Sequence, residues 1–138
     1  MILLDTSGLL AALDSSQRHH REAAASLVAA RPPLLLSPFV LAELDYLVAS
    51  RVGSVARTSL LEEVERGAYL LEPMTSTDVT RAHAVIGRYA DLEISLADAS
   101  LVVLAERHRV REVLSLDERH FRVLTVCGKP FRVLPADA

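Results

Sequence analysis

Short, wholly apolar runs alternate along the chain with longer segments rich in Ala and Leu. Runs of this kind are typical of strands that are buried on both faces, as in a parallel sheet. The four runs expected as strands are Met1–Leu4, Leu34–Leu36, Ala68–Leu71 and Val113–Leu114, and Val123–Leu134 fits a last strand or strand pair.

The segments between these runs are predicted as helices by their composition and their boundary residues. The expected helices are Leu9–Leu13, Glu22–Ala30, Pro38 to about Arg51, Val55–Arg66, a helix capped by Thr77 and Asp78 that runs to about Tyr89, and one capped by Ser95 that extends to His108. Ser37 followed by Pro38 is a typical helix start, and Gly67 is a typical stop. Short strands that alternate with helices predict an α/β fold with a short, mainly parallel β-sheet flanked by helices.

Length and composition narrow the class of protein. The 138 residues, 1–138, are the usual size of one domain, and 51% hydrophobic against 24% charged residues excludes intrinsic disorder. The only cysteine, Cys127, allows neither an internal disulfide nor a cysteine zinc site. No basic segment precedes the first apolar run, and the longest uncharged stretch, Pro32–Ala42, is shorter than the ~18 residues of a spanning helix. We therefore expect a cytoplasmic protein.

The charges are unevenly distributed. Fifteen Lys and Arg against 18 Asp and Glu give a net charge of −3, which excludes a polycationic tail. Seven of the cations nevertheless lie near the carboxyl end, at Arg107, Arg109, Arg111, Arg119, Arg122, Lys129 and Arg132. This end could bind a polyanion, or it could be an ordinary solvated basic face.

Acidic side chains follow the predicted strands at the edge where ligands bind in parallel sheets. Asp5 comes directly after the first strand, and Asp117 lies three residues beyond Leu114. Each of them alone could equally cap a helix or form an Asx turn. Their common edge makes a shared site the stronger hypothesis.

Three further acids lie on predicted helices. Asp98 lies on a helix that is apolar nearly all round, where an unpaired carboxylate is costly, and Ser95 already offers a cap. We therefore expect Asp98 to have a metal or cationic partner. Glu43 and Asp45 both lie at the border of an apolar stripe, and periodicity does not distinguish between them.

Carboxylates that cluster without matching bases need a cation among them. Ligands that are all oxygens favour Mg²⁺ or Mn²⁺ over zinc. The chain has no His-x-x-x-His or His-Glu-x-x-His pattern, and the adjacent His19 and His20 are interpreted as surface residues.

The pattern as a whole resembles the PIN-domain nucleases, and in particular the small VapC-like toxins of bacterial toxin–antitoxin pairs. The resemblance covers essentially the whole chain. It is carried by Leu3-Leu4-Asp5-Thr6-Ser7, by Ser37-Pro38 through Ala42-Glu43-Leu44, by Leu96-Ala97-Asp98-Ala99 and by Ser115-Leu116-Asp117-Glu118-Arg119-His120-Phe121. The four acids are separated by 38, 55 and 19 positions. Ser115 departs mildly from the family, in which Thr is commoner at that position.

The resemblance implies a single PIN-like domain that hydrolyses RNA phosphodiester bonds with Mg²⁺ or Mn²⁺, acting as the toxin of a toxin–antitoxin pair. It implies catalytic metal ligands at Asp5, Glu43, Asp98 and Asp117, and so favours Glu43 over Asp45. It gives Thr6 or Ser7 a supporting role in holding metal-bound water or phosphate. A cognate antitoxin and a homodimer are implied as partners, and the candidate contacts to RNA are Arg107, Arg119 and Arg122.

Two other functions compete with this hypothesis. A phosphorelay receiver domain also has acids after its first strand, and Lys129-Pro130 resembles its late Lys-Pro. That function requires an aspartate at the end of a mid-chain strand, where this sequence has Ser37 and Glu72. The stronger alternative is a PIN-like module that binds RNA or protein without cutting.

Overall fold

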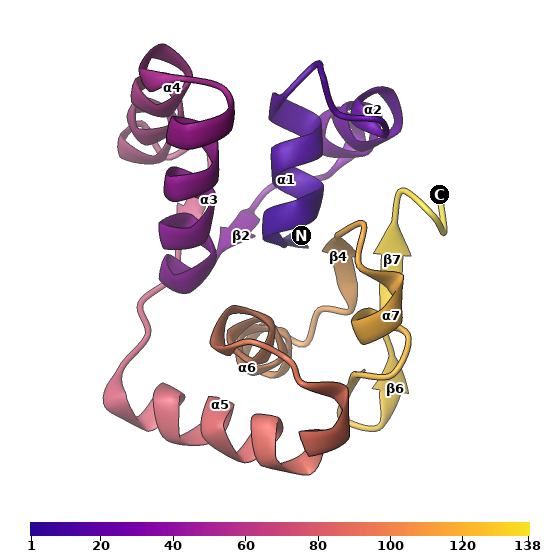
Figure 1. Ribbon diagram of the computed structural model, residues 1–138. Coiled ribbons are helices and arrows are strands. Elements are labelled where there is room, and N and C mark those ends of the chain that lie inside the picture. Colours follow the sequence, from indigo (N-terminus) through magenta and orange to yellow (C-terminus); the bar gives the residue numbers. More distant parts are fainter.

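A computed structural model describes residues 1–138 as an α/β domain with a central five-stranded parallel sheet (Figure 1). The helices are α1 Thr6–Leu13, α2 His20–Ala29, α3 Pro38–Arg51, α4 Ser54–Glu65, α5 Ser76–Arg88, α6 Leu96–His108 and α7 Glu118–Phe121, with a 3₁₀ turn η1 at Ala90–Leu92. The strands are β1 Ile2–Leu4, β2 Leu34–Leu36, β3 Leu70–Leu71, β4 Glu112–Leu114, β5 Thr125–Val126, β6 Lys129–Pro130 and β7 Arg132–Leu134. The sheet order is β3-β2-β1-β4-β7, and β5 and β6 form a separate antiparallel pair.

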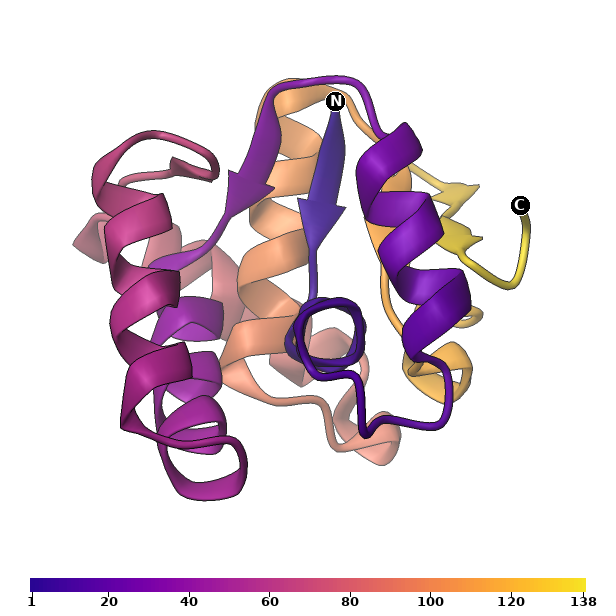
Figure 2. The ribbon, with the colours of Figure 1, turned by 90° about the horizontal axis from the view of Figure 1, so that it is seen from above.

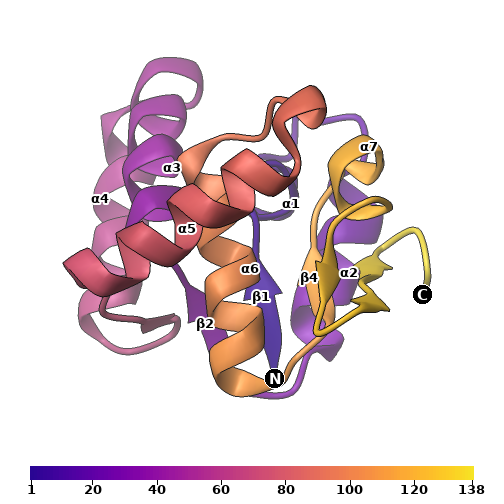
Figure 3. The same ribbon diagram turned by 90° about the horizontal axis from the view of Figure 1, so that it is seen from below.

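Helices cover both faces of the sheet. Helix α1 packs against α2 and α3 on one face, while α5 packs against α6 on the other. Seen from above, β1 lies between α6 and the end of α1 (Figure 2). Seen from below, α5 lies across α6 (Figure 3). This arrangement leaves the strand ends as the accessible parts of the sheet.

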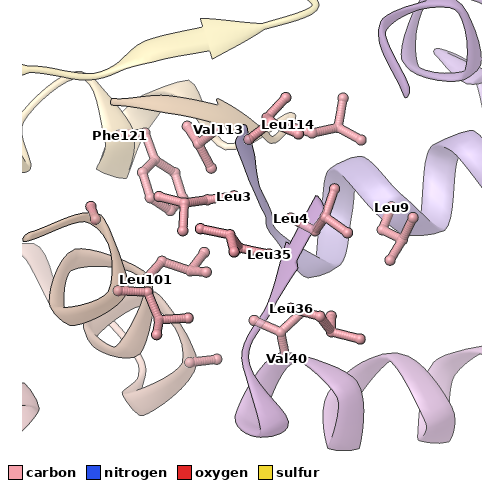
Figure 4. Packing of buried hydrophobic residues seen from close by; sticks show 14 of the residues in the cluster. Leu3, Leu4, Leu9, Leu35, Leu36, Val40, Leu101, Val113, Leu114 and Phe121 are labelled. Atoms are coloured by element: carbon pink, nitrogen blue, oxygen red, sulfur yellow. The ribbon is translucent and has the colours of Figure 1, made fainter. Parts of the chain in front are cut away.

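The core forms around β1, in which all three residues are buried. Leu3 and Leu4 contact strands on both sides, in register with Val113 and Leu114 of β4 and with β2 (Figure 4). Phe121 of α7 is fully buried and packs edge-on against Phe131. The short helix α7 is thereby fixed against the core beside the end of β4.

Helix α1 approaches β4 so closely that only glycine fits at one position. A Cβ atom built on Gly8 would lie 2.2 Å from the backbone oxygen of Leu114. This contact holds the first turn of α1, which begins directly after Asp5, against the end of β4.

The expected α/β class and parallel sheet are confirmed, with small shifts of element ends. Helix α1 begins at Thr6 and not at Leu9, because the turn after Asp5 is already helical. Of the two predicted caps of α5, Asp78 is confirmed as part of the capping box, whereas Thr77 was wrong, because the N-cap is Thr75. Helix α7 was not predicted, since it is a single turn.

The expectation that both early histidines are surface residues holds only for His19. The Nδ1 atom of His20 lies 2.8 Å from the backbone oxygen of Ala11, and its ring is half-buried. No helix is long and apolar enough to span a membrane.

Candidate metal centre

Asp5 lies at the carboxyl end of β1, buried beneath the loop that follows β4. Its backbone N–H donates to the backbone oxygen of Leu114, which extends the hydrogen bonding between β1 and β4 by one residue. Its Oδ2 atom accepts hydrogen bonds from Ser115 Oγ at 2.6 Å and from Ser7 Oγ at 2.9 Å. The side chain is 5% exposed, so these two hydroxyl groups replace much of its hydration.

Asp98 lies in the first turn of α6 and takes part in the helix cap. Its Oδ2 accepts the Ser95 N–H at 3.1 Å, while Ser95 Oγ accepts the Asp98 N–H at 3.0 Å. The sequence-based assumption that Ser95 alone fills this role was wrong, because the two residues form a reciprocal capping box. The Oδ1 atom of Asp98 makes no hydrogen bond to the protein and remains free for a ligand.

Asp117 and His120 complete the cluster from α7. Asp117 is the N-cap, and its Oδ1 accepts the His120 N–H at 3.0 Å. The Nδ1 atom of His120 lies 2.6 Å from Asp117 Oδ2 and 3.5 Å from Asp98 Oδ2. One potential ligand atom from each of these three residues lies within 4.8 Å of the others.

Burial disfavours the charged forms of Asp5 and Asp98. Burial raises the pKa of Asp5 to about 6; the Asp98 charge adds to this, and the Ser115 and Ser7 hydroxyls oppose it. Burial also raises the pKa of Asp98, and the backbone of Ser95 and then His120 oppose that rise. A cation among the carboxylates would remove this penalty.

Glu43 joins the site through a neighbouring hydroxyl group. Thr6 Oγ1 donates to Glu43 Oε1 at 2.8 Å, which ties α3 to the first residue of α1. Asp45, which periodicity could not distinguish from Glu43, instead forms a bidentate ion pair with Arg57 of α4 at 2.6 and 3.1 Å. The two acids therefore lie in different environments, and Glu43 is the one that contacts Thr6, the residue after Asp5.

These residues fit a divalent cation by their chemistry. Asp5 and Asp98 are buried acids, and burial raises the pKa of both, so a nearby cation would stabilise their charged forms. Carboxylate oxygens are the ligands that Mg²⁺ and Mn²⁺ prefer. The hydroxyl groups of Thr6 and Ser7 already donate to Glu43 and Asp5, so in the structure they orient carboxylates.

The three arginines expected to contact RNA lie in unlike surroundings. Arg107 binds Asp78 at 2.8 Å and the Pro73 oxygen at 3.0 Å, near the far end of α6 from Asp98. Arg122 binds both Glu118 and Asp137. Arg119 is exposed and has no partner in the chain. Of the three, only Arg119 has a guanidinium group that is free to meet a phosphate.

His120 and Ser115 were not identified as site residues from the sequence, although both lie in the segment that carries the resemblance. The available signal was spacing: His120 follows Asp117 by three residues, which places both on one face of a helical turn. Ser115 lies two residues before Asp117, and its Oγ also accepts the Asp117 N–H at 2.9 Å.

The chain is similar to known proteins over most of its length. The family model described as "PIN domain" matches residues 2–125. Ribonuclease VapC26 of Mycobacterium tuberculosis is 40% identical over 97% of this chain and 100% of its own length. The crystal structure of VapC20 of Mycobacterium tuberculosis, a sarcin-ricin loop cleaving toxin, matches with a TM-score of 0.79 over 85% of this chain and 90% of that one, at 21% identity.

A more distant match is FitAcB from Neisseria gonorrhoeae, with a TM-score of 0.53, 28% identity and coverage of 79% of this chain and 83% of that chain. The receiver-domain alternative is excluded, because the family match spans nearly the whole chain and the second and third strands are followed by Ser37 and Glu72. With the PIN model covering residues 2–125 and a VapC ribonuclease at 40% identity over nearly its full length, the chain belongs to the VapC group of the PIN-domain family.

Proposed function

We propose that this protein is a Mg²⁺- or Mn²⁺-dependent endoribonuclease and the toxin of a toxin–antitoxin pair. The observation that carries the proposal is that one potential ligand atom from each of Asp98, Asp117 and His120 lies within 4.8 Å of the others. Asp5 is linked to Asp117 through Ser115, and burial raises the pKa of both Asp5 and Asp98. Similarity to a protein named a ribonuclease over 97% of the chain supports RNA as the substrate.

In the proposed reaction, Asp5, Glu43, Asp98 and Asp117 hold one or two divalent ions. A divalent ion held by these four acids would lower the pKa of a water molecule and stabilise the leaving oxyanion of the cut phosphodiester. The protein supplies orientation: Ser115 and Ser7 fix Asp5, the capping box fixes Asp98, and His120 holds Asp117 through its Nδ1 atom. The fold thus presets the carboxylates before any metal arrives.

The remaining partners are proposed from the family. A cognate antitoxin would neutralise the acidic cluster, for which a bidentate arginine is well suited. We propose a homodimer as the active form and the cytoplasm as its compartment. Growth arrest on unopposed expression, relieved by the cognate antitoxin, tests the toxin role; harmless expression of folded protein that cleaves RNA would exclude it.

Cleavage assays with matched variants test the enzyme proposal. Purified protein should cut RNA in Mg²⁺ or Mn²⁺ and not in EDTA. Glu43→Gln should abolish cutting, whereas the control Asp45→Asn, two residues away on the same helix, should retain it. Binding of RNA without cutting in any divalent metal would instead identify a non-catalytic PIN module.

A further inference from the structure

The sheet edge opposite the acidic cluster carries a hollow lined by arginines. It has a volume of about 770 Å³ and lies between the end of α2, the α6–β4 connection and β7. Its basic residues are Arg31, Arg109, Arg111 and Arg132. The N-terminus and the end of α6 near it lie away from α7 (Figure 3). Met1 and Arg109 line the hollow, which places it at this edge.

A second hollow adjoins the first and continues the basic surface. It has a volume of about 520 Å³, shares Arg109 and Arg111 with the first hollow, and adds Lys129 and Glu106. Across both hollows the side chains supply five cations against Glu106 and Glu112. We call this surface the basic track: Arg31, Arg109, Arg111, Lys129 and Arg132.

The track contains fixed and free guanidinium groups. Arg132 pairs with Glu112 at 2.7 Å, and Arg111 donates to the Pro130 oxygen at 3.2 Å, so these two are held by the protein. Arg31 and Arg109 are exposed and have no partner in the chain. Arg111 and Arg132 are therefore held in place by the protein, whereas Arg31 and Arg109 are available to bind an anion.

Arg109 also occupies a backbone conformation that arginine does not favour. It ends α6 in the left-handed region at φ 54° and ψ 43°, where glycine or asparagine is the usual residue. An L-residue held there costs stability, and such positions cluster at functional sites.

We infer that the basic track binds the phosphate backbone of the RNA substrate at a distance from the cut, an inference that rests on the proposed function. Arginine binds phosphate bidentately, and one-sided charge in a hollow raises the local concentration of a polyanion. Asp98 and Arg109 are 11 residues apart on α6, or roughly 17 Å at ~1.5 Å per residue. At ~3.4 Å per nucleotide of a stacked strand, this corresponds to about five nucleotide steps. A folded RNA can bridge the two edges, whereas a di- or trinucleotide cannot.

The first experiment measures binding of a labelled hairpin RNA of mixed sequence in EDTA, where no cutting occurs. The double variant Arg31→Gln with Arg109→Gly should weaken binding at least tenfold. It should also reduce the slope of log affinity against log salt by about 1.4 to 1.8, since two phosphate contacts contribute ~0.7 to ~0.9 each. The control Arg66→Gln with Arg81→Gln removes two exposed charges elsewhere and should leave both quantities unchanged.

A second measurement separates a binding role from a structural one. Arg109→Gly should melt at the same temperature as the parent or higher, because glycine favours that backbone, and still bind the hairpin more weakly. In Mg²⁺, the double variant should raise KM for the hairpin and leave cleavage of a trinucleotide unchanged. If the double variant cuts RNA with an unchanged KM and an unchanged salt slope, the inference about the basic track is wrong. The proposed function would still stand.

The remaining outcomes are equally decisive. If the wild-type protein cuts no RNA, the proposed function is wrong. The binding experiment in EDTA still shows whether the basic track binds RNA. If polyglutamate displaces the hairpin as effectively as a second RNA does, the track binds acidic protein segments and the inference is wrong.

Discussion

Ser115 Oγ donates a hydrogen bond of 2.6 Å to Asp5 Oδ2, across 110 positions of sequence. The same oxygen accepts the Asp117 N–H, so a single hydroxyl group links two of the candidate metal ligands. Ser115 is 1% exposed, so its hydroxyl group is shielded from solvent. The geometry of the site at the β1 and β4 ends therefore depends on a residue that is not itself a ligand.

Ser115→Ala should weaken metal binding and cleavage while preserving the fold. The variant removes a hydrogen bond to a buried carboxylate, which contributes about 1.5–3 kcal/mol. That hydrogen bond lowers the pKa of Asp5, so its loss should raise the pKa further and reduce Mg²⁺ affinity roughly tenfold. Isothermal titration of Mg²⁺ measures this directly. Ser115→Thr keeps the hydroxyl group and should bind metal more tightly than Ser115→Ala; equal affinities would show that the hydrogen bond has no role.

Gly8→Ala should destabilise the protein by at least about 1–3 kcal/mol. The added methyl group would lie 2.2 Å from the backbone oxygen of Leu114, so α1 or β4 must shift, and overpacking of this kind costs about 1–3 kcal/mol or more. Chemical denaturation gives the change. Gly87→Ala on α5 is the control, because a Cβ there meets nothing within 4 Å and should stabilise the helix slightly. A Gly8→Ala protein as stable as wild type would contradict the close approach of α1 to β4.

The sequence predicted those parts of the fold that depend on local chemistry. Pro38 and Arg51 bound α3 as expected, because Ser37 provides an N-cap and Pro38 a first turn. The single turn α7 was missed, because its position depends on burial of Phe121 against Phe131 and not on any local pattern. A contact of this kind becomes visible only when the strands are assembled.

The candidate site also contains residues that the sequence could place and residues that it could not. Asp5 and Asp117 could be placed at one edge because both follow strands, whereas Glu43 and Asp45 could not be distinguished by periodicity. Their difference arises from tertiary partners, since Thr6 meets Glu43 and Arg57 meets Asp45. For the arginines, sequence revealed a charge excess but not which guanidinium groups were already paired.

Arg107→Gln should lower stability and leave RNA affinity unchanged. Arg107 binds Asp78 at 2.8 Å and the Pro73 oxygen at 3.0 Å, and these contacts join α6 to the start of α5. Loss of hydrogen bonds to a charged group should cost about 2 kcal/mol. Arg119→Gln provides the contrast, because its exposed side chain has no partner and its removal should not affect the melting temperature. A fall in RNA affinity for Arg107→Gln at unchanged stability would show that Arg107 contacts RNA and does not stabilise the fold.

The metal-free protein should lose stability as pH rises from about 4 to about 6. The pKa of Asp5 is 3.8 in the unfolded chain and about 6 in the fold, so the folded state holds the proton more tightly across this window. Deprotonation therefore opposes folding, by about 3 kcal/mol for a shift of this size. The raised pKa of Asp98 acts in the same direction.

Urea denaturation in EDTA across this pH range measures the effect, and Asp5→Asn should flatten the dependence. Acids with lowered pKa values, such as Asp78 and Asp137, lose their stabilising effect only as pH falls below about 3.8, so they act outside this window. A wild-type stability that rises steadily from pH 4 to 6 would show that Asp5 is not destabilised as an anion.

Asp98→Asn should raise the melting temperature in EDTA and reduce the further rise that Mg²⁺ produces. Burial outweighs the favourable contacts of Asp98 with Ser95 and His120, so its negative charge is a net cost to the metal-free fold. Asparagine removes the charge and keeps an oxygen for the Ser95 N–H. For wild type, free Mg²⁺ at ~100 times its Kd should add about 2.7 kcal/mol, provided that the unfolded chain binds little.

Asp78→Asn is a matched control, because Asp78 occupies the same third position of a capping box, at the start of α5. The pKa of Asp78 is lowered, first by the Thr75 backbone and then by Arg107, so its charge stabilises the fold. Its replacement should lower the melting temperature and leave the Mg²⁺-dependent rise intact. Two carboxylates with the same local role should therefore respond in opposite directions, since only one of them faces the acidic cluster. If Asp98→Asn behaves like Asp78→Asn, Asp98 serves the helix cap and is not a metal ligand.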